Sequence, residues 1–201
     1  MEGRKFLFGK LHSLLGVVPI GAFLIMHLST NFQATKGPET FNAWAGFLES
    51  LPFLLFLEVV FIYLPILYHG VYGLYVAFQA SPNLGNFGTF RNWMFVLQRV
   101  TGIIAFIFII WHVWETRFAR DPHLEDFYSL MSGILSNPAM YIFYLVGVLA
   151  TVFHFSNGMW SFLVSWGVTI GPRAQKMSTY VWAVVFILLS IVSVMSINAF
   201  V

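Results

Sequence analysis

Five long apolar segments restrict what this chain can fold into. They cover residues 11–32, 53–78, 93–114, 139–166 and 180–201. Each reaches the length of about 20 residues that a helix needs to cross the hydrocarbon core of a bilayer. Every backbone polar group must be paired within that core, and a helix pairs them within one segment. We therefore predict an all-α membrane protein, a single domain over residues 1–201 with five transmembrane helices, of which the first four form a four-helix bundle.

The composition supports a membrane setting and excludes several classes of protein. Charged residues make up 9% of the 201 residues, against roughly 25% in a soluble domain, and the mean hydropathy is +0.80. The formal net charge is only +2 and no run of basic residues occurs, which argues against nucleic-acid binding. The chain has no cysteine, so it cannot hold a disulfide, a thiolate-bound iron–sulfur cluster or a covalently attached c-type haem.

The distribution of lysine and arginine predicts the orientation of the chain in the membrane. Seven of these residues fall on the side of the N-terminus and three on the other side. Because short cytoplasmic loops carry the excess of positive charge, we expect a cytoplasmic N-terminus and an external C-terminus. The seven are Arg4, Lys5, Lys10, Arg91, Arg99, Arg173 and Lys176, and the three are Lys36, Arg117 and Arg120.

Histidine is the residue type that points to a function. Two of the six histidines, His12 and His123, lie at the end of an apolar segment or in a loop. The other four lie within the first four apolar segments, one in each: His27, His69, His112 and His154. Ionisable side chains inside a membrane are rare because their burial is costly, and those that occur mostly serve a function.

The spacing of these four histidines indicates an internal repeat. His27 and His69 are 42 residues apart, and so are His112 and His154. The second pair follows the first at an offset of 85 residues, which we interpret as two helical hairpins related as a parallel repeat. The repeat predicts an outer level that holds His27 and His112 and an inner level, nearer the cytoplasm, that holds His69 and His154. The same offset relates Gly73 to Gly158, Leu64 to Leu149 and Ser13 to Gln98.

Two facing histidines at each level favour haem over other cofactors. Imidazole also binds zinc and copper, but a structural zinc site needs four ligands, whereas haem iron needs only two from the protein. The sequence therefore predicts two b-type haems in the bundle, with His27 and His112 as axial ligands of the outer iron and His69 and His154 as those of the inner iron. Gly70, Gly73 and Gly158 are candidates to give a flat ring access to the backbone. Histidines that only hydrogen-bond neighbouring helices are the simpler alternative.

Polar residues at the ends of the segments are candidates for contacts with the haem propionates. Ser13 and Gln98 each precede a histidine by 14 residues, which places them on nearly the same helix face at the cytoplasmic end. His12 and Arg99 lie beside them, so we predict that these four residues hold the inner propionates. Trp93 is a weaker candidate, because arginine and tryptophan also anchor helices at the membrane boundary.

Glu58 is the carboxylate most clearly inside an apolar segment. It precedes His69 by 11 residues, or about three helical turns, so we expect it on the same face and near the outer level. It is a candidate for proton exchange with a quinone or for contact with the outer haem, and a position at the headgroup boundary is the alternative. Further candidates for polar contacts are Glu115 and Arg117 at the outer end and Tyr72 and Asn157 at the inner end.

Several stretches together resemble one family. They are KLHSLLGVVPIGAFLIMHL, SLPFLLFLE, YHGVYGLYVAF, FRNWMFVLQRVTGIIAFIFIIWHVWETR, GVLATVFHFSNGMWSF and GPRAQKMSTYV. They resemble the cytochrome b558 membrane-anchor subunits of Bacillus-type succinate dehydrogenases, over nearly the whole chain. Lys10 stands where we expect arginine in that family, which leaves a propionate role for this position open.

The resemblance implies a five-helix anchor with two b haems in a bacterial plasma membrane, ligated by the same four histidines. It also implies a flavoprotein subunit and an iron–sulfur subunit as partners on the cytoplasmic face. Electrons from the iron–sulfur subunit would pass through the inner and then the outer haem to menaquinone. The chain has no cysteine and too few polar residues for a flavin domain, so it cannot oxidise succinate itself.

Three other functions remain compatible with these residues. The first is the dihaem anchor of a quinol:fumarate reductase, because axial ligands do not encode the direction of catalysis. The second, from a different class, is a transporter or proton channel that uses intramembrane histidine and glutamate as a relay. The third is a structural membrane anchor whose histidine sites hold no haem.

Overall fold

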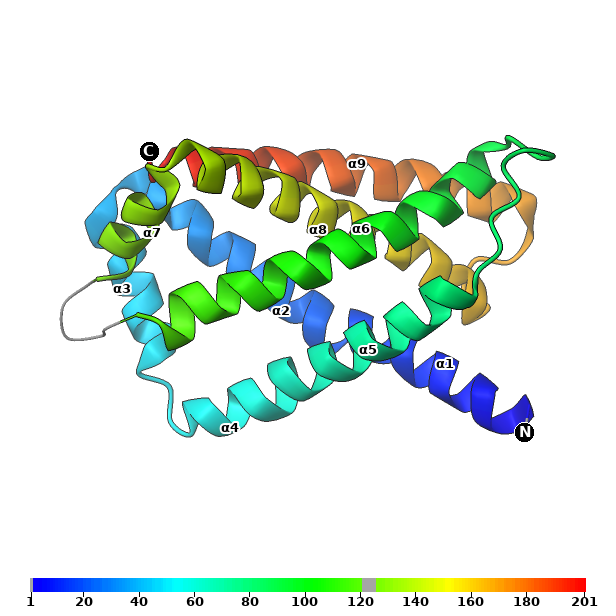
Figure 1. The fold of residues 1–201 in the computed structure, drawn as a ribbon, viewed down its shortest axis with the longest axis horizontal. Coiled ribbons are helices and arrows are strands. Elements are labelled where there is room, and N and C mark those ends of the chain that lie inside the picture. The colour runs from blue at the N-terminus through cyan, green and yellow to red at the C-terminus, as the bar shows by residue number, and fades with distance from the viewer. Residues whose placement is uncertain (1, 121–125) are drawn as a thin grey trace.

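The computed structural model describes residues 2–120 and 126–201, and these residues form helices and no strands. The five apolar helices expected from the sequence are confirmed (Figure 1). His123 lies outside the described residues. The five candidate membrane spans are Gly3–Lys36, Leu54–Gln79, Phe90–Phe118, Pro138–Ser165 and Gly171–Asn198.

The first span is interrupted once, at a proline. Helix α1 runs over Glu2–Val17 and α2 over Pro19–Asn31, followed by a 3₁₀ turn, η1, over Phe32–Lys36. Pro19 has no backbone N–H to continue the hydrogen-bond ladder, so the α-helical pattern restarts after Val18.

The second span changes its hydrogen-bond pattern midway for a similar reason. Helix α4 (Leu54–Glu58) continues into a π-helical segment, η2 (Val59–Tyr63), and then into α5 (Leu64–Gln79). Pro65, in the first turn of α5, cannot donate a hydrogen bond. The wider π turn accommodates this defect inside the membrane, where backbone groups must find partners within the protein.

The remaining spans are longer uninterrupted helices. Helix α6 (Phe90–Val113) begins at Thr89, whose side chain caps it, and ends in a second π-helical segment, η3 (Trp114–Phe118). Helix α8 covers Pro138–Ser165 and α9 covers Gly171–Asn198. The capping side chain of α8 is Asn137.

Helix α8 is the centre of the packing, because it lies against both α6 and α9 (Figure 1). Small residues allow the close approach that membrane helices use in place of a hydrophobic driving force. A Cβ atom on Gly147 of α8 would lie 2.2 Å from the Phe108 ring of α6, and one on Gly21 of α2 would lie 2.8 Å from the Phe155 ring. Helix α1 packs mainly on α5, and α9 also contacts α2, so the fifth span is an integral part of the bundle.

The two ends of the molecule differ in structure. Two short helices, α3 (Pro38–Glu49) and α7 (Phe127–Leu135), gather with the C-terminus at one end, where Phe41, Leu135 and Phe200 form a buried cluster. The N-terminus and the connections α5–α6 and α8–α9 lie at the opposite end (Figure 1). The termini therefore lie at opposite ends, as an odd number of spans requires.

Candidate functional site

The inner pair of histidines comes from α5 and α8. The ring centroids of His69 and His154 lie 6.0 Å apart, with the rings nearly perpendicular. His69 Nδ1 lies 2.8 Å from the carbonyl oxygen of His12, and His154 Nδ1 lies 3.0 Å from that of Gln98. A carbonyl can only accept, so Nδ1 of each ring carries the proton, and Nε2 of each neutral ring keeps the lone pair that a metal ion binds.

The outer pair comes from α2 and α6. The ring centroids of His27 and His112 lie 5.8 Å apart at an angle of 70°. Phe23 stacks on His27 at 5.3 Å, and Phe108 stacks on His112 at 5.6 Å. Each outer imidazole therefore lies among aromatic rings, in a setting suited to a broad apolar ligand.

The two pairs occupy separate levels of the bundle, as the repeat predicted. Gln98 contacts the inner pair and His112 belongs to the outer pair, and both are on α6. The 14 residues between them correspond to about 21 Å along the helix axis. This spacing leaves room for one cofactor at each level.

The geometry of each pair fits a metal ion held by one nitrogen from each ring. A metal–imidazole bond is about 2 Å long, so two rings on one ion have centroids roughly 6 Å apart. Within residues 2–120 and 126–201, no three metal-ligating side chains lie close enough to share an ion. A four-ligand zinc site is therefore disfavoured at either level, whereas haem iron takes two protein ligands.

Two glycines that the sequence analysis missed face the inner imidazoles. A Cβ atom on Gly16 would lie 2.4 Å from His69 Cε1, and one on Gly102 would lie 2.8 Å from His154 Cε1. Each glycine follows by one turn the residue whose carbonyl holds the ring, His12 or Gln98. That spacing of four residues is the sequence signal that identifies them.

The structure pairs Gln98 with His12 rather than with Ser13. At this level the two halves are related by an offset of 86 residues, whereas His27 and His112 keep 85. The Pro19 interruption lies between the two levels and accounts for the additional residue in the first half. Ser13 instead accepts a hydrogen bond from the Trp166 indole at 3.0 Å and donates one to the Lys10 carbonyl.

The glycines singled out from the sequence make room for side chains of neighbouring helices. Gly73 faces His12 Nε2, and Gly158 faces the side-chain nitrogen of Gln98, each with a prospective Cβ distance of 3.1 Å. Gly70 faces the Phe106 ring. In this structure the three glycines thus serve the packing around the inner level.

Two of the residues predicted to hold propionates have a buried nitrogen without a hydrogen-bond partner in the described part of the chain. The His12 ring stacks on His69 at a centroid distance of 4.1 Å, and its Nε2 is unpartnered. Arg99 donates through Nη1 to the Phe95 carbonyl at 2.8 Å, but its Nε is unpartnered. Unpaired buried donors are costly, so both nitrogens favour an additional acceptor at this end.

The remaining inner candidates have partners within the protein or lie at the surface. Asn157 donates to the Gln98 side-chain oxygen at 2.7 Å, which orients that amide against His154. The Tyr72 ring lies 5.5 Å from that of His12. Trp93 is half exposed on α6, as expected of a residue at the membrane boundary.

Glu58 forms an ion pair with Arg117, 3.0 Å from Oε2 to Nη2, between the second and third spans. The expectation that Glu58 shares a helix face with His69 is wrong. The π-helical segment η2 lies between them, so their separation is not a whole number of α-helical turns. Glu58 directly precedes η2 and Arg117 lies within η3, so a π segment adjoins each partner at the outer end.

Glu115 belongs to a hydrogen-bonded chain that sequence reasoning missed. Tyr144 of α8, which is 2% exposed, donates to Glu115 Oε2 at 2.9 Å, and its hydroxyl lies 3.4 Å from His112 Nδ1. Trp111 donates to the same carboxylate oxygen at 3.2 Å. Tyr144 thus links His112 to a carboxylate, and the sequence gave no periodic signal for this contact because it crosses between helices.

Comparison with known proteins agrees with this arrangement. Residues 79–193 match the family described as the succinate dehydrogenase/fumarate reductase transmembrane subunit. The chain is also 56% identical, over 198 residues and 98% of each chain, to the succinate dehydrogenase cytochrome b558 subunit of Bacillus subtilis (strain 168). The chain belongs to this family of transmembrane subunits. The family match includes His112 and His154, and the similarity to the Bacillus protein extends over all four intramembrane histidines.

Proposed function

We propose that this chain is the dihaem cytochrome b membrane anchor of a succinate dehydrogenase, which delivers electrons from an iron–sulfur subunit to menaquinone. His69 and His154 would hold the inner b haem, and His27 and His112 the outer one. Each bound haem would supply a one-electron carrier. The family includes fumarate reductases, and the name of the Bacillus relative favours the succinate dehydrogenase direction.

The observation that carries this proposal is the matched anchoring of the inner rings. Both Nδ1 atoms are held by carbonyls of adjacent helices, at 2.8 and 3.0 Å. Such hydrogen bonds from the second ring nitrogen fix the tautomer and orientation of metal-binding histidines. Neighbouring His12 and Arg99 provide unpartnered donors for an anionic group, and together with Gln98 and Ser13 they are our candidates for the inner propionates.

The partners follow from family membership and from charge. We propose that a flavoprotein and an iron–sulfur subunit dock at the end that holds the N-terminus, which lies in the cytoplasm of a bacterial cell. Seven of the ten lysines and arginines lie toward that end of the sequence pattern, as the positive-inside rule requires.

A haem count tests the proposal directly. The purified chain is expected to contain two haems by pyridine haemochrome assay and to show a b-type reduced-minus-oxidised spectrum. Both haems have two imidazole ligands, so the ferric protein should give low-spin resonances from two centres in electron paramagnetic resonance. A chain that binds no haem would instead support the proton-relay or structural-anchor alternatives.

Glu58 is proposed to exchange protons with menaquinone near the outer level. In the Glu58→Gln variant we expect menaquinone reduction to fall about 100-fold, the lower range for loss of a general acid–base group. Succinate oxidation with an artificial acceptor should be unchanged. Glu49→Gln is the matched control, because Glu49 also pairs with an arginine, Arg120, at 3.3 Å. Unchanged menaquinone reduction in Glu58→Gln would remove the proton role.

Tyr144 is proposed to position His112 and to tune the outer haem. Tyr144→Phe removes the hydroxyl between His112 Nδ1 and Glu115 while it retains the buried ring. The imidazole becomes a weaker donor, so we expect the outer midpoint potential to rise by up to about 60 mV, equivalent to a tenfold change for one electron. Tyr141→Phe is the control, because the Tyr141 hydroxyl contacts Asn198 instead. Equal potentials in both variants would contradict the assignment.

A further inference from the structure

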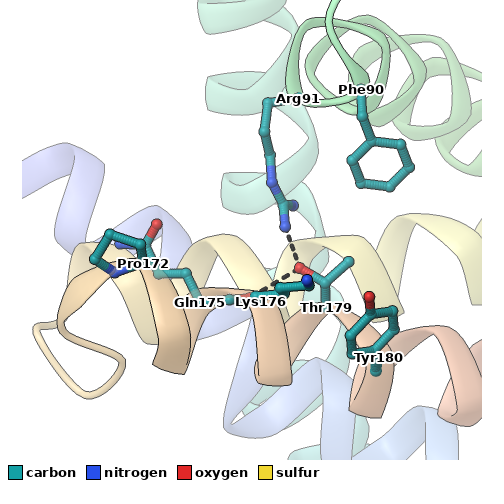
Figure 2. A pocket seen from close by; sticks show the side chains of 7 residues that line it. All are labelled: Phe90, Arg91, Pro172, Gln175, Lys176, Thr179 and Tyr180. Carbon is teal, nitrogen blue, oxygen red and sulfur yellow. Dashed lines mark hydrogen bonds between the residues drawn. The ribbon is translucent and has the colours of Figure 1, made fainter.

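A cavity of about 450 Å³ lies between α6 and α9 at the end that holds the N-terminus (Figure 2). Its volume is within the range of small-molecule sites. None of its residues belongs to the two histidine levels. The lining consists of Phe90 and Arg91 from the start of α6 and of Pro172, Gln175, Lys176, Thr179 and Tyr180 from the first turns of α9.

Arg91 is held in place at this cavity by two other helices. Its guanidinium lies 3.6 Å from the centroid of a ring of Trp160 on α8, and it donates a hydrogen bond to the Thr179 hydroxyl on α9 (Figure 2). Thr179 and the Trp160 indole both donate to the Gln175 carbonyl, at 2.8 and 3.0 Å. The cation is therefore preorganised, and a ligand that binds it loses little side-chain entropy.

No carboxylate balances the positive charge of this cavity. The sequence contains no aspartate or glutamate over residues 59–114 or 127–201, the ranges that include Arg91 and Lys176. Both ion pairs found within the described residues, Glu58–Arg117 and Glu49–Arg120, lie at the other ends of the second and third spans. An anion is the ligand that this arrangement favours.

An exposed apolar stripe continues from the cavity along α9. Tyr180, Val184, Ile187 and Ile191 follow the spacing of one helix face, and each is between 50% and 56% exposed. Lys176 lies on the same face, one turn before Tyr180. The cavity thus places two cations at the membrane boundary, above an apolar surface that runs into the bilayer.

We propose that this cavity binds the phosphate headgroup of an anionic phospholipid, with Arg91 and Lys176 at the phosphate and an acyl chain along the α9 stripe. Basic pockets between transmembrane helices on the cytoplasmic side recognise anionic headgroups in this way. A lipid explains both the charge and the stripe, whereas a free phosphate explains only the charge.

Native mass spectrometry of the full chain in detergent, titrated with phosphatidylglycerol, tests the proposal. The Arg91→Gln/Lys176→Gln variant is expected to bind roughly thirtyfold more weakly, the effect of two cations near the membrane surface. The Lys5→Gln/Lys36→Gln variant removes the same charge at positions outside the cavity and should bind like the wild type. Arg91→Lys, which retains the charge, should keep most of the affinity and guards against a folding defect.

Three further measurements can overturn the proposal. Equal binding of phosphatidylcholine would show that the headgroup charge is not recognised. Displacement of phosphatidylglycerol by an excess of inorganic phosphate would indicate a site for free anions. Loss of phosphatidylglycerol binding when the chain assembles with its partner subunits would assign the cavity to a subunit contact. Retention of binding through all three supports the lipid site, and none of these results depends on the haem assignment.

Discussion

Replacing His154 by alanine is expected to reduce the haem content from two to one per chain and to leave the outer haem in place. His154 is one of only two ring ligands at the inner level, and its partner His69 cannot complete an axial pair alone. The two levels are separated by about 21 Å along α6, so the outer pair should be little affected. The pyridine haemochrome assay and redox titration of the remaining haem measure both outcomes.

Matched variants make this result specific. His112→Ala should remove the outer haem and keep the inner one, so the two single variants should differ in the midpoint potential that remains. Ser156→Ala is a control on the same helix, because Ser156 is buried and its hydroxyl has no partner within the described residues. Added imidazole should restore haem binding to His154→Ala, since it can fill the vacated ligand position. Two haems in His154→Ala would refute the ligand assignment.

Replacing Gly102 by alanine is expected to displace the inner haem although the histidine itself is unchanged. The new Cβ atom would lie 2.8 Å from His154 Cε1 and 3.0 Å from Nδ1. The ring cannot move aside without losing the contact between Nδ1 and the Gln98 carbonyl at 3.0 Å. We therefore expect haem content to fall toward one per chain.

The sign of the Gly102→Ala effect distinguishes this cause from a change in helix propensity. Alanine within a helix is favoured over glycine by about 1 kcal/mol, so without the clash the variant would be more stable. Gly9→Ala on α1 is the control, because nothing lies within 4 Å of its prospective Cβ atom. If Gly102→Ala retained two haems with unchanged potentials, the inner imidazole would have to lie elsewhere when haem is bound.

The sequence alone determined the elements and the pairing of the four histidines. Hydropathy and length are local properties, so the five spans could be recognised without knowledge of their packing. The pairing of His27 with His112 and of His69 with His154 followed from the repeat, because antiparallel spans of similar length bring equivalent positions to one level. Phe127, Tyr128 and the rest of α7 lay between the predicted spans and were not anticipated as a helix.

Only the tertiary structure decided which residues surround those histidines. Periodicity assumes an unbroken α-helix, and prolines interrupt that pattern in both spans of the first hairpin. Pro19 moves the equivalent of Gln98 from Ser13 to His12, and the π segment before Pro65 separates Glu58 from the His69 face. Contacts between helices, such as Tyr144 with His112 and Gly102 with His154, depend on the relative rotation of two helices. A single sequence carries no local signal for that rotation, because side-chain packing of the whole bundle sets it.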